Sequence, residues 1–252
     1  MKTRTLFRAA LAAAVLATAG VSAQTKPADR VASFAKLPNW TGFWIAESRN
    51  NLGLSGRAPP GAPPNVGVLR GKPPYTSEFA AKVEEQRKNA SAATKECGFP
   101  FPFVMENPWV FQFLLTPEES VMIWGGREVR HIYTDGRKHP KPEDIWPTPW
   151  GDSVGHWEGQ TLVVDTIAIQ PSRFPPALSD QAHFTERLRM VGTDKFEDEL
   201  TIEDPVAFTQ PWKVTLPYER VTDLDRMVHG LCDENDRNPV VDGKIIIAPA
   251  GR

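Results

Sequence analysis

Residues 150–166, WGDSVGHWEGQTLVVDT, contain the pattern that decides the fold of this chain. The pair Glu158–Gly159 separates two short runs that are rich in residues favoured in β-strands. A glycine in a tight connection between two such runs is typical of a β-hairpin. The stretch therefore predicts two antiparallel strands joined by a turn, and this geometry explains Gly159 and an exposed Glu158 without any catalytic role.

Similar short runs extend along the chain in both directions from this hairpin. They are separated by turn residues such as Gly125–Gly126, Asp135–Gly136 and the run 192–194. Consecutive hairpin-linked strands predict a mainly β chain, an antiparallel meander that forms a lipocalin-like barrel or a strongly curled sheet. A two-sheet sandwich is the main alternative. The expected strands are Trp40–Glu47, Trp109–Leu115, Ser120–Trp124, Glu128–Thr134, Ser153–Trp157, Thr161–Ala168, His183–Val191, Phe196–Glu203, Trp212–Glu219 and Arg226–Cys232.

The first expected strand favours the barrel. Residues 39–44, NWTGFW, resemble the start of lipocalin barrels, where a glycine precedes a tryptophan whose indole plugs one end. Two ordinary core aromatics on a strand are the alternative. Before the later strands, the Pro- and Gly-rich residues 55–74 predict an extended arm, and helical spacing predicts a helix over 76–92.

Residues 1–23 have the form of a secretory signal peptide, with a basic start, a short apolar stretch and a small-residue cleavage site ending at Ala23. We therefore expect a periplasmic or secreted protein in which residues 24–252 form one β-rich domain. The apolar stretch is too short to span a bilayer comfortably, so we expect no stable membrane insertion. In an oxidising compartment we expect a disulfide between Cys97 and Cys232, with two free buried thiols as the alternative.

Charge and motifs narrow the classes of partner and cofactor. The net charge of -2 gives no electrostatic reason to expect a nucleic-acid partner. The chain has no nucleotide-binding glycine motif and no nucleophile elbow, so we expect no cofactor. Its five histidines are dispersed without metal-ligand spacing, so we expect no metal site. Two histidines and a carboxylate that converge from separate strands are the alternative.

Ionisable residues on apolar strand faces are the candidates for chemistry. Residues i and i+2 of a strand share a face, so an ionisable residue that alternates with apolar ones is expected to point inward. Asp165, for example, lies between Val163 and Ile167, whereas His156 lies next to a turn and is expected at a rim. The side chains expected to point inward are His131, Asp165, Glu186 and His229.

These inward groups would form an acid–base site if they shared one cavity, because carboxylates and imidazoles there would pair and shift each other's pKa. A structural role is the alternative for each of them. Glu186, for instance, can pair with Arg130 or Arg187.

Aromatic residues predict a ligand pocket. The chain has 8 Trp and 13 Phe, and the long Pro-rich loop over 135–152 has the character of a lid or binding loop. Such side chains could line a site for a flat apolar or phenolic ligand, although filling a large β core is an equal alternative. The candidate substrate-binding residues are Trp146, Trp150, His156, Trp109 and Phe111.

A set of motifs between about residues 100 and 235 forms a wider pattern: REVRHIYTDGRKHP (127–140), GDSVGHWEGQTLVVDT (151–166), TERLR (185–189), TIEDPVAFTQPW (201–212) and CDEN (232–235). Together they resemble a family of secreted bacterial proteins, which implies export and a β-rich fold but no particular activity. The chain departs from the family pattern at Gln160, at 177–180 and at His131. The matching positions are Arg130, Tyr133, Asp135, Arg137, His139, Trp157, Glu158, Asp165, Glu186, Arg187, Asp204 and Trp212.

These residues lead to three functional hypotheses. The first is a cofactor-independent lyase or isomerase acting on a small aromatic or apolar substrate, with phenols as one candidate class. The second is an exported lipocalin-like carrier of a small hydrophobic ligand, and the third is an envelope protein whose Pro-rich arm contacts a partner. In the first, His131 or His229 is the acid or base, Asp165 and Glu186 orient it or shuttle the proton, and Tyr133 or Arg130 stabilises negative charge on the substrate.

Overall fold

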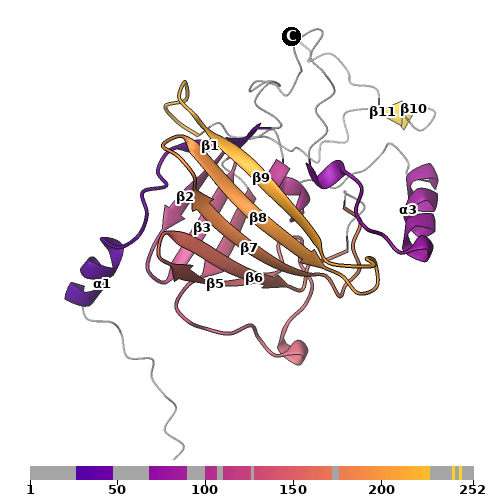
Figure 1. Cartoon of the computed structure of the whole chain (residues 1–252), viewed down its shortest axis with the longest axis horizontal. Coiled ribbons are helices and arrows are strands. Elements are labelled where there is room, and N and C mark those ends of the chain that lie inside the picture. The colour runs from indigo at the N-terminus through magenta and orange to yellow at the C-terminus, as the bar shows by residue number, and fades with distance from the viewer. Residues whose placement is uncertain are drawn as a thin grey trace, which may run out of the picture.

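The structure, a computed structural model, describes residues 27–47, 68–89, 100–106, 110–125, 128–171, 176–227, 240–241 and 244–245. Within these ranges the chain forms one closed β-barrel with short helices outside it (Figure 1). The expected signal peptide, most of the expected arm and both cysteines lie outside the described residues, so export and the disulfide stay predictions.

The barrel is built from strands in their sequence order. Neighbours along the chain are neighbours in the sheet, and β1 pairs with β9 to close the ring. The prediction of a mainly β barrel is confirmed, and the sandwich alternative is wrong. The described strands of the barrel are β1 (Phe43–Ala46), β2 (Phe111–Leu115), β3 (Glu119–Trp124), β4 (Glu128–Tyr133), β5 (Asp152–Glu158), β6 (Thr161–Ile167), β7 (His183–Met190), β8 (Lys195–Glu203) and β9 (Trp212–Val221).

One pair of strands departs from the expected antiparallel meander. β4 and β5 run parallel, with Tyr133 opposite Val154. A ring of nine strands that alternate in direction cannot close, because nine is odd, and one parallel pair removes the mismatch. Parallel neighbours need a long crossover connection, which residues 134–151 provide. The expected strand Arg226–Cys232 is not seen either: Arg226 and Met227 are in no strand, and its remaining residues lie outside the described part.

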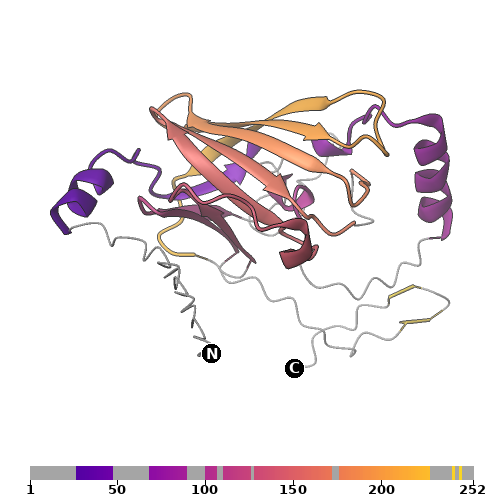
Figure 2. The same cartoon turned by 90° about the horizontal axis from the view of Figure 1, so that it is seen from below.

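The helices lie outside the barrel. Figures 1 and 2 show α1 (Pro27–Phe34) and α3 (Ser77–Asn89) on opposite sides of it. α3 confirms the helix expected over 76–92, and the Thr76 hydroxyl accepts a hydrogen bond from the Phe79 N–H at 3.2 Å as an N-cap. α1 was not predicted. The described helices include none that is long and apolar enough to cross a membrane. The remaining short elements are η1 (Val68–Arg70), η2 (Phe103–Glu106), η3 (Pro142–Asp144) and the β10 (Val240–Val241) and β11 (Lys244–Ile245) hairpin.

One end of the barrel is closed by Trp40. Its ring lies 4.9 Å from Phe113 on β2, 5.2 Å from Trp157 on β5 and 4.9 Å from Phe196 on β8, measured between ring centroids. These three strands are evenly spaced around the ring, so the indole lies across the barrel interior. Its burial removes a large apolar surface from water.

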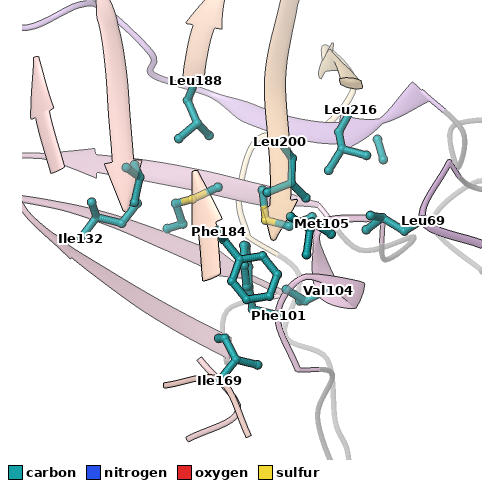
Figure 3. Packing of buried hydrophobic residues seen from close by; sticks show 14 of the residues in the cluster. Leu69, Phe101, Val104, Met105, Ile132, Ile169, Phe184, Leu188, Leu200 and Leu216 are labelled. Carbon is teal, nitrogen blue, oxygen red and sulfur yellow. The ribbon is translucent and has the colours of Figure 1, made fainter. Parts of the chain in front are cut away.

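The segment before β2 packs against the barrel from another direction. η2 is wholly buried, and Figure 3 shows Phe101, Val104 and Met105 together with the strand residues Phe184 and Leu200. The Phe101 and Phe184 rings meet edge to face, with centroids 4.9 Å apart. This segment therefore covers the part of the interior where β7 begins.

The hairpin motif of residues 151–166 is explained by this geometry. Gly159 has a φ of +64° and forms the turn between β5 and β6, as predicted. Gly151 has the same φ, and a Cβ there would lie 2.4 Å from the carbonyl oxygen of Ile167. Both glycines are thus required by backbone conformation, and Gly151 also by space.

Candidate functional site

The burial pattern decides which strand faces point into the barrel. On β4 the inner residues are Arg130 and Ile132, so His131 lies on the outer face. On β6 the inner residues are Leu162, Val164 and Thr166, so Asp165 is also outside. The predicted inward orientation of His131 and Asp165 is therefore wrong. Both strands carry apolar residues on both faces, so the apolar residues of the outer face made His131 and Asp165 look as if they pointed inward.

Glu186 points inward as predicted and is paired with Arg130. Both side chains are buried, with relative exposures of 0% and 1%. The guanidinium donates to both carboxylate oxygens of Glu186, with Nη1 2.8 Å from Oε1 and Nη2 in contact with Oε2. Nη2 also donates to the Thr166 hydroxyl at 2.9 Å and to the Ser153 hydroxyl at 3.2 Å. A two-pronged pair of this kind holds a buried charge firmly in one position.

An aromatic ring completes the environment of Arg130. The central carbon of the guanidinium lies 4.2 Å from the centroid of the Phe101 ring, a cation–π distance. Phe101 belongs to the segment that covers this part of the interior. The buried ion pair and the covering segment are therefore in direct contact.

Asp198 on β8 is a second buried carboxyl group beside this pair. It is 0% exposed, and neither of its oxygens accepts a hydrogen bond from an N–H or O–H donor in the part of the chain that the structure describes. Burial and the neighbouring Glu186 carboxylate raise the pKa of Asp198 well above its ordinary value. The register explains the contact: Glu186 is opposite Leu200 and Leu188 is opposite Asp198, so the two acids are diagonal neighbours on the inner face. Burial and the nearby Glu186 carboxylate therefore favour the protonated form of the Asp198 carboxyl group.

Tyr218 on β9 extends the cluster to a third adjacent strand. Its side chain is wholly buried, and its hydroxyl has no hydrogen-bond partner among the described residues. Burial, and to a smaller extent the neighbouring carboxyl groups, raise the pKa of the phenol well above its ordinary value. Asp198 is opposite Leu216 in the ladder and Tyr218 is the next inner residue, so these two are also diagonal neighbours. The phenol is neutral and free to donate or accept a hydrogen bond.

Arg130, Glu186, Asp198 and Tyr218 form what we call the interior cluster. The charges of Arg130 and Glu186 cancel, and Asp198 adds a carboxylic acid in a setting that excludes water. Two interacting carboxyl groups release and take up protons as a pair. Buried polar groups without partners are uncommon and are found where a ligand, a water or a reacting group belongs.

Two members of the interior cluster were missed by the sequence interpretation. Asp198 alternates with Phe196, Leu200 and Ile202, so the face rule that found Glu186 finds it too. Tyr218 alternates with Leu216 in the same way. The alternation that predicts an inward-facing side chain was therefore present in both strands.

Asp165 belongs to a second cluster, on the outer face. Its two oxygens meet Nε2 of His139 and Nε2 of His183, each at 2.7 Å. His139 Nδ1 lies 2.5 Å from Asp152, and His183 Nδ1 lies 3.3 Å from Glu203. His139 sits in the crossover 134–151, so this chain of alternating acids and imidazoles ties the crossover to β5, β6, β7 and β8. We call it the outer clamp.

The outer clamp has a structural role. Asp165 is 43% exposed, and both nitrogens of each imidazole already face carboxylates, which leaves no ring nitrogen for a substrate. Of the described residues, no three His, Cys, Asp or Glu side chains are arranged to hold a metal ion.

The other predicted catalytic residues lie outside the barrel or beyond the described residues. His131 is exposed and pairs with Glu119 at 2.5 Å. Tyr133 lies beneath Arg137, with the guanidinium carbon 4.0 Å from the ring centroid. His229 is outside the described residues. Of the predicted catalytic residues that the structure describes, only Arg130 and Glu186 therefore share a site.

The predicted substrate-binding residues divide in the same way. Phe111 is buried beside the interior cluster, 5.1 Å from Tyr218 between ring centroids. Trp150 packs on Trp124 at 5.3 Å, whereas Trp146 is 74% exposed. The remaining two are His156, which is exposed and pairs with Glu158, and Trp109, which lies outside the described residues.

Asp204, in the motif 201–212, is a buried structural hub. Its carboxylate accepts hydrogen bonds from the Ser179 N–H and hydroxyl and from the N–H groups of Val206 and Ala207, at 2.7 to 3.1 Å. These bonds fix the turn that follows β8. This motif is explained by folding alone.

The chain matches no family model, no curated protein and no solved structure, so its site is interpreted from its own residues.

Proposed function

We propose that this chain is a cofactor-independent acid–base enzyme, a lyase or isomerase that acts on a small aromatic or apolar substrate inside the barrel. The observation that carries the proposal is the fully buried carboxyl group of Asp198 beside the Glu186–Arg130 pair, where burial raises its pKa. A carboxylic acid kept neutral by its surroundings is a ready proton donor at neutral pH.

The interior cluster supplies the groups that either reaction needs. A lyase must protonate a leaving group or take a proton from the substrate, and an isomerase must remove a proton from one atom and return it to another. Asp198 and Glu186 together can hold or release one proton, and Arg130 limits the cost of the state in which both are ionised. Asp198 and Tyr218 thus take the roles that His131, His229 and Tyr133 had in the sequence hypothesis.

The surroundings of the cluster suit an aromatic or apolar ligand. Phe111 and Phe196 flank Tyr218, with ring centroids 5.1 and 6.0 Å away, and Phe101 lies against Arg130. Apolar and aromatic walls around a few polar groups are the usual composition of small-molecule sites. Export through the N-terminal signal peptide is part of the proposal and would place this activity in the periplasm or outside the cell.

The proposal is tested by proton exchange. The purified protein is incubated in D₂O with a panel of small phenolic and terpenoid compounds, and proton NMR follows both C–H exchange and new products. We expect exchange or turnover of at least one compound with the wild type. Asp198→Asn, which keeps the shape but cannot give up a proton, should lower the rate by about 10²–10⁴-fold.

Ser120→Ala is the matched control for this experiment. Ser120 is a buried residue on β3 whose hydroxyl also lacks a partner among the described residues, but it is not part of the interior cluster. We expect this variant to retain the wild-type rate. An equal loss in both variants would contradict a specific role for Asp198.

An exported carrier is the second candidate. The observation that favours it is the complete burial of the cluster beneath Phe101, which suits retention of a ligand better than rapid exchange of substrates. If compounds of the panel bind tightly but none shows exchange or a new product, the protein is a carrier and the enzyme proposal is wrong.

A further inference from the structure

The junction between β4 and β5 has little backbone pairing. Of the described residues, only Tyr133 and Val154 are opposite each other there, whereas β5 and β6 pair from Asp152–Ile167 to Glu158–Thr161. The crossover 134–151 leaves β4 and enters β5 at this junction (Figure 1). Whatever holds the crossover against the barrel therefore also helps to close the junction.

Side chains of the outer clamp hold the crossover. His139 contacts Asp152, where β5 begins, at 2.5 Å and Asp165 on β6 at 2.7 Å. It is 18% exposed, which makes it the least exposed member of the clamp. The far end of the crossover is held by a backbone bridge between Thr148 and Ile169. The part of the crossover around His139 thus depends on ionisable groups.

The contacts of His139 need more hydrogens than a neutral imidazole supplies. A neutral imidazole has one N–H and one lone pair, and an ionised carboxylate only accepts hydrogen bonds. Both ring nitrogens of His139 face carboxylate oxygens, so the two contacts together need one extra proton. This count holds whether that proton lies on the ring or on a carboxyl group.

His183 repeats the arrangement on the barrel itself. Its Nε2 lies 2.7 Å from Asp165 and its Nδ1 lies 3.3 Å from Glu203. The closed clamp therefore binds protons that the separated groups do not hold above about pH 6.5, where an imidazole in water becomes neutral.

We propose that the outer clamp is a pH-sensitive latch, which holds the crossover against the barrel while His139 is bound to both carboxylates and releases it when the extra proton is lost. After that loss, one ring nitrogen presents a lone pair to a carboxylate oxygen, so one of the two contacts must break. The β4–β5 junction is then held by its short backbone pairing alone. The latch does not depend on the proposed function, since it acts whether or not the interior cluster is catalytic.

The charges around the two imidazoles make the release favourable. The groups that face them are carboxylates from three strands: Asp152 of β5, Asp165 of β6 and Glu203 of β8. Lys138, next to His139 in the chain, is exposed to solvent. Other cations of the crossover and of the outer face of β7 are engaged by other acids: Arg137 by Asp135, Lys141 by Glu143, Arg187 by Glu158 and Arg189 by Glu199. Loss of protons therefore leaves the three clamp carboxylates to repel one another.

Hydrogen–deuterium exchange measured by mass spectrometry tests the latch in the whole protein. Labelling at pH 6 and at pH 8 uses times adjusted to the chemical exchange rate of free amides at each pH. We expect the protection of peptides from 134–151 to fall by about 10-fold or more from pH 6 to pH 8, because one bound proton contributes up to about 10-fold per pH unit. Peptides from β8, which pairs along its length with β7 and β9, are the internal control and should keep their protection.

Three variants assign the effect to His139. His139→Gln cannot take up the extra proton and should give weak protection of the crossover at both pH values. His139→Arg keeps a permanent positive charge with several donors and should keep most of the protection at pH 8. His131→Gln is the matched control, because it removes an exposed histidine that pairs with one carboxylate, Glu119, outside the clamp, and it should behave as the wild type.

Each outcome decides the proposal. Equal protection of the crossover at pH 6 and pH 8 in the wild type would overturn the latch, and so would wild-type behaviour of His139→Gln. A loss of protection in β8 as large as that in the crossover would mean that the whole barrel opens, which also contradicts a local latch. If His139→Arg does not fold, the comparison of the wild type with His139→Gln and His131→Gln is sufficient.

Discussion

Replacing Arg130 by methionine is expected to lower the free energy of unfolding by about 3–5 kcal/mol. The substitution leaves the buried Glu186 carboxylate without its cation, next to a second buried acid, Asp198. Removing one partner of a buried ion pair is strongly destabilising, even where the intact pair adds little stability. The remaining charge then has neither water nor a counter-ion around it. Urea unfolding at pH 7 measures the change.

Two further variants separate charge from packing. Arg189→Met removes a half-buried arginine that pairs with Glu199 on the outer face, and we expect a loss of no more than about 1 kcal/mol. In the double variant Arg130→Met/Glu186→Gln no isolated charge remains, so part of the lost stability should return. A loss below about 1 kcal/mol in Arg130→Met would show that the pair is not buried as described.

Replacing Gly151 by alanine is expected to lower the free energy of unfolding by about 3–4 kcal/mol. The residue has a φ of +64°, which costs any residue with a Cβ about 1–2 kcal/mol. The new Cβ would also lie 2.4 Å from the Ile167 carbonyl oxygen and 2.8 Å from Ile169 Cδ1, so the start of β5 must shift.

Gly159→Ala is the matched control, because Gly159 has the same φ of +64° but no atom within 4 Å of the Cβ position. The free energy of unfolding of Gly159→Ala should fall only by the cost of the positive φ, about 1–2 kcal/mol. The difference between the two variants in chemical denaturation therefore measures the crowding at Gly151 alone. Equal losses of stability in the two variants would contradict the predicted crowding at Gly151.

The strands were predictable because alternation and turn residues are local signals. Expected and observed bounds of the hairpin differ little: Thr161–Ala168 was expected, and β6 covers Thr161–Ile167. Glu186 was placed correctly because the other face of β7 carries His183, Arg187 and Arg189, so the two faces differ clearly. Where one face is polar and the other apolar, period-2 alternation fixes the orientation.

The faces of β4 and β6 could not be assigned by the same rule. Valine and isoleucine occur on both faces there, and the crossover 134–151, tied down by His139, keeps the outer face around Asp165 partly covered. That cover is a tertiary feature with no local signal.

The pairing of Arg130 with Glu186 is likewise hidden in the sequence. The two residues are 56 positions apart and lie on β4 and β7, which are not neighbours in the sheet. They meet only because the sheet curls and closes. The parallel β4–β5 pair follows from the same closure, since it depends on the number of strands in the ring.

The proton on Asp198 is tested most directly by comparing the wild type with Asp198→Asn in urea unfolding between pH 5 and pH 8. The pKa of Asp198 is raised in the folded state, so the native protein holds a proton that the unfolded chain releases above its ordinary value of 3.8. The stability due to this group is therefore complete below that value and is lost as the pH rises toward the raised pKa.

Carboxyl groups outside the Asp198–Glu186 pair contribute equally to both proteins and cancel in the difference. We predict that the wild type becomes steadily less stable than Asp198→Asn as the pH rises, by up to about 1.4 kcal/mol per pH unit for one proton. A difference that stays constant from pH 5 to pH 8 would mean that Asp198 is already ionised in the folded barrel, and it would contradict the proposed proton donor.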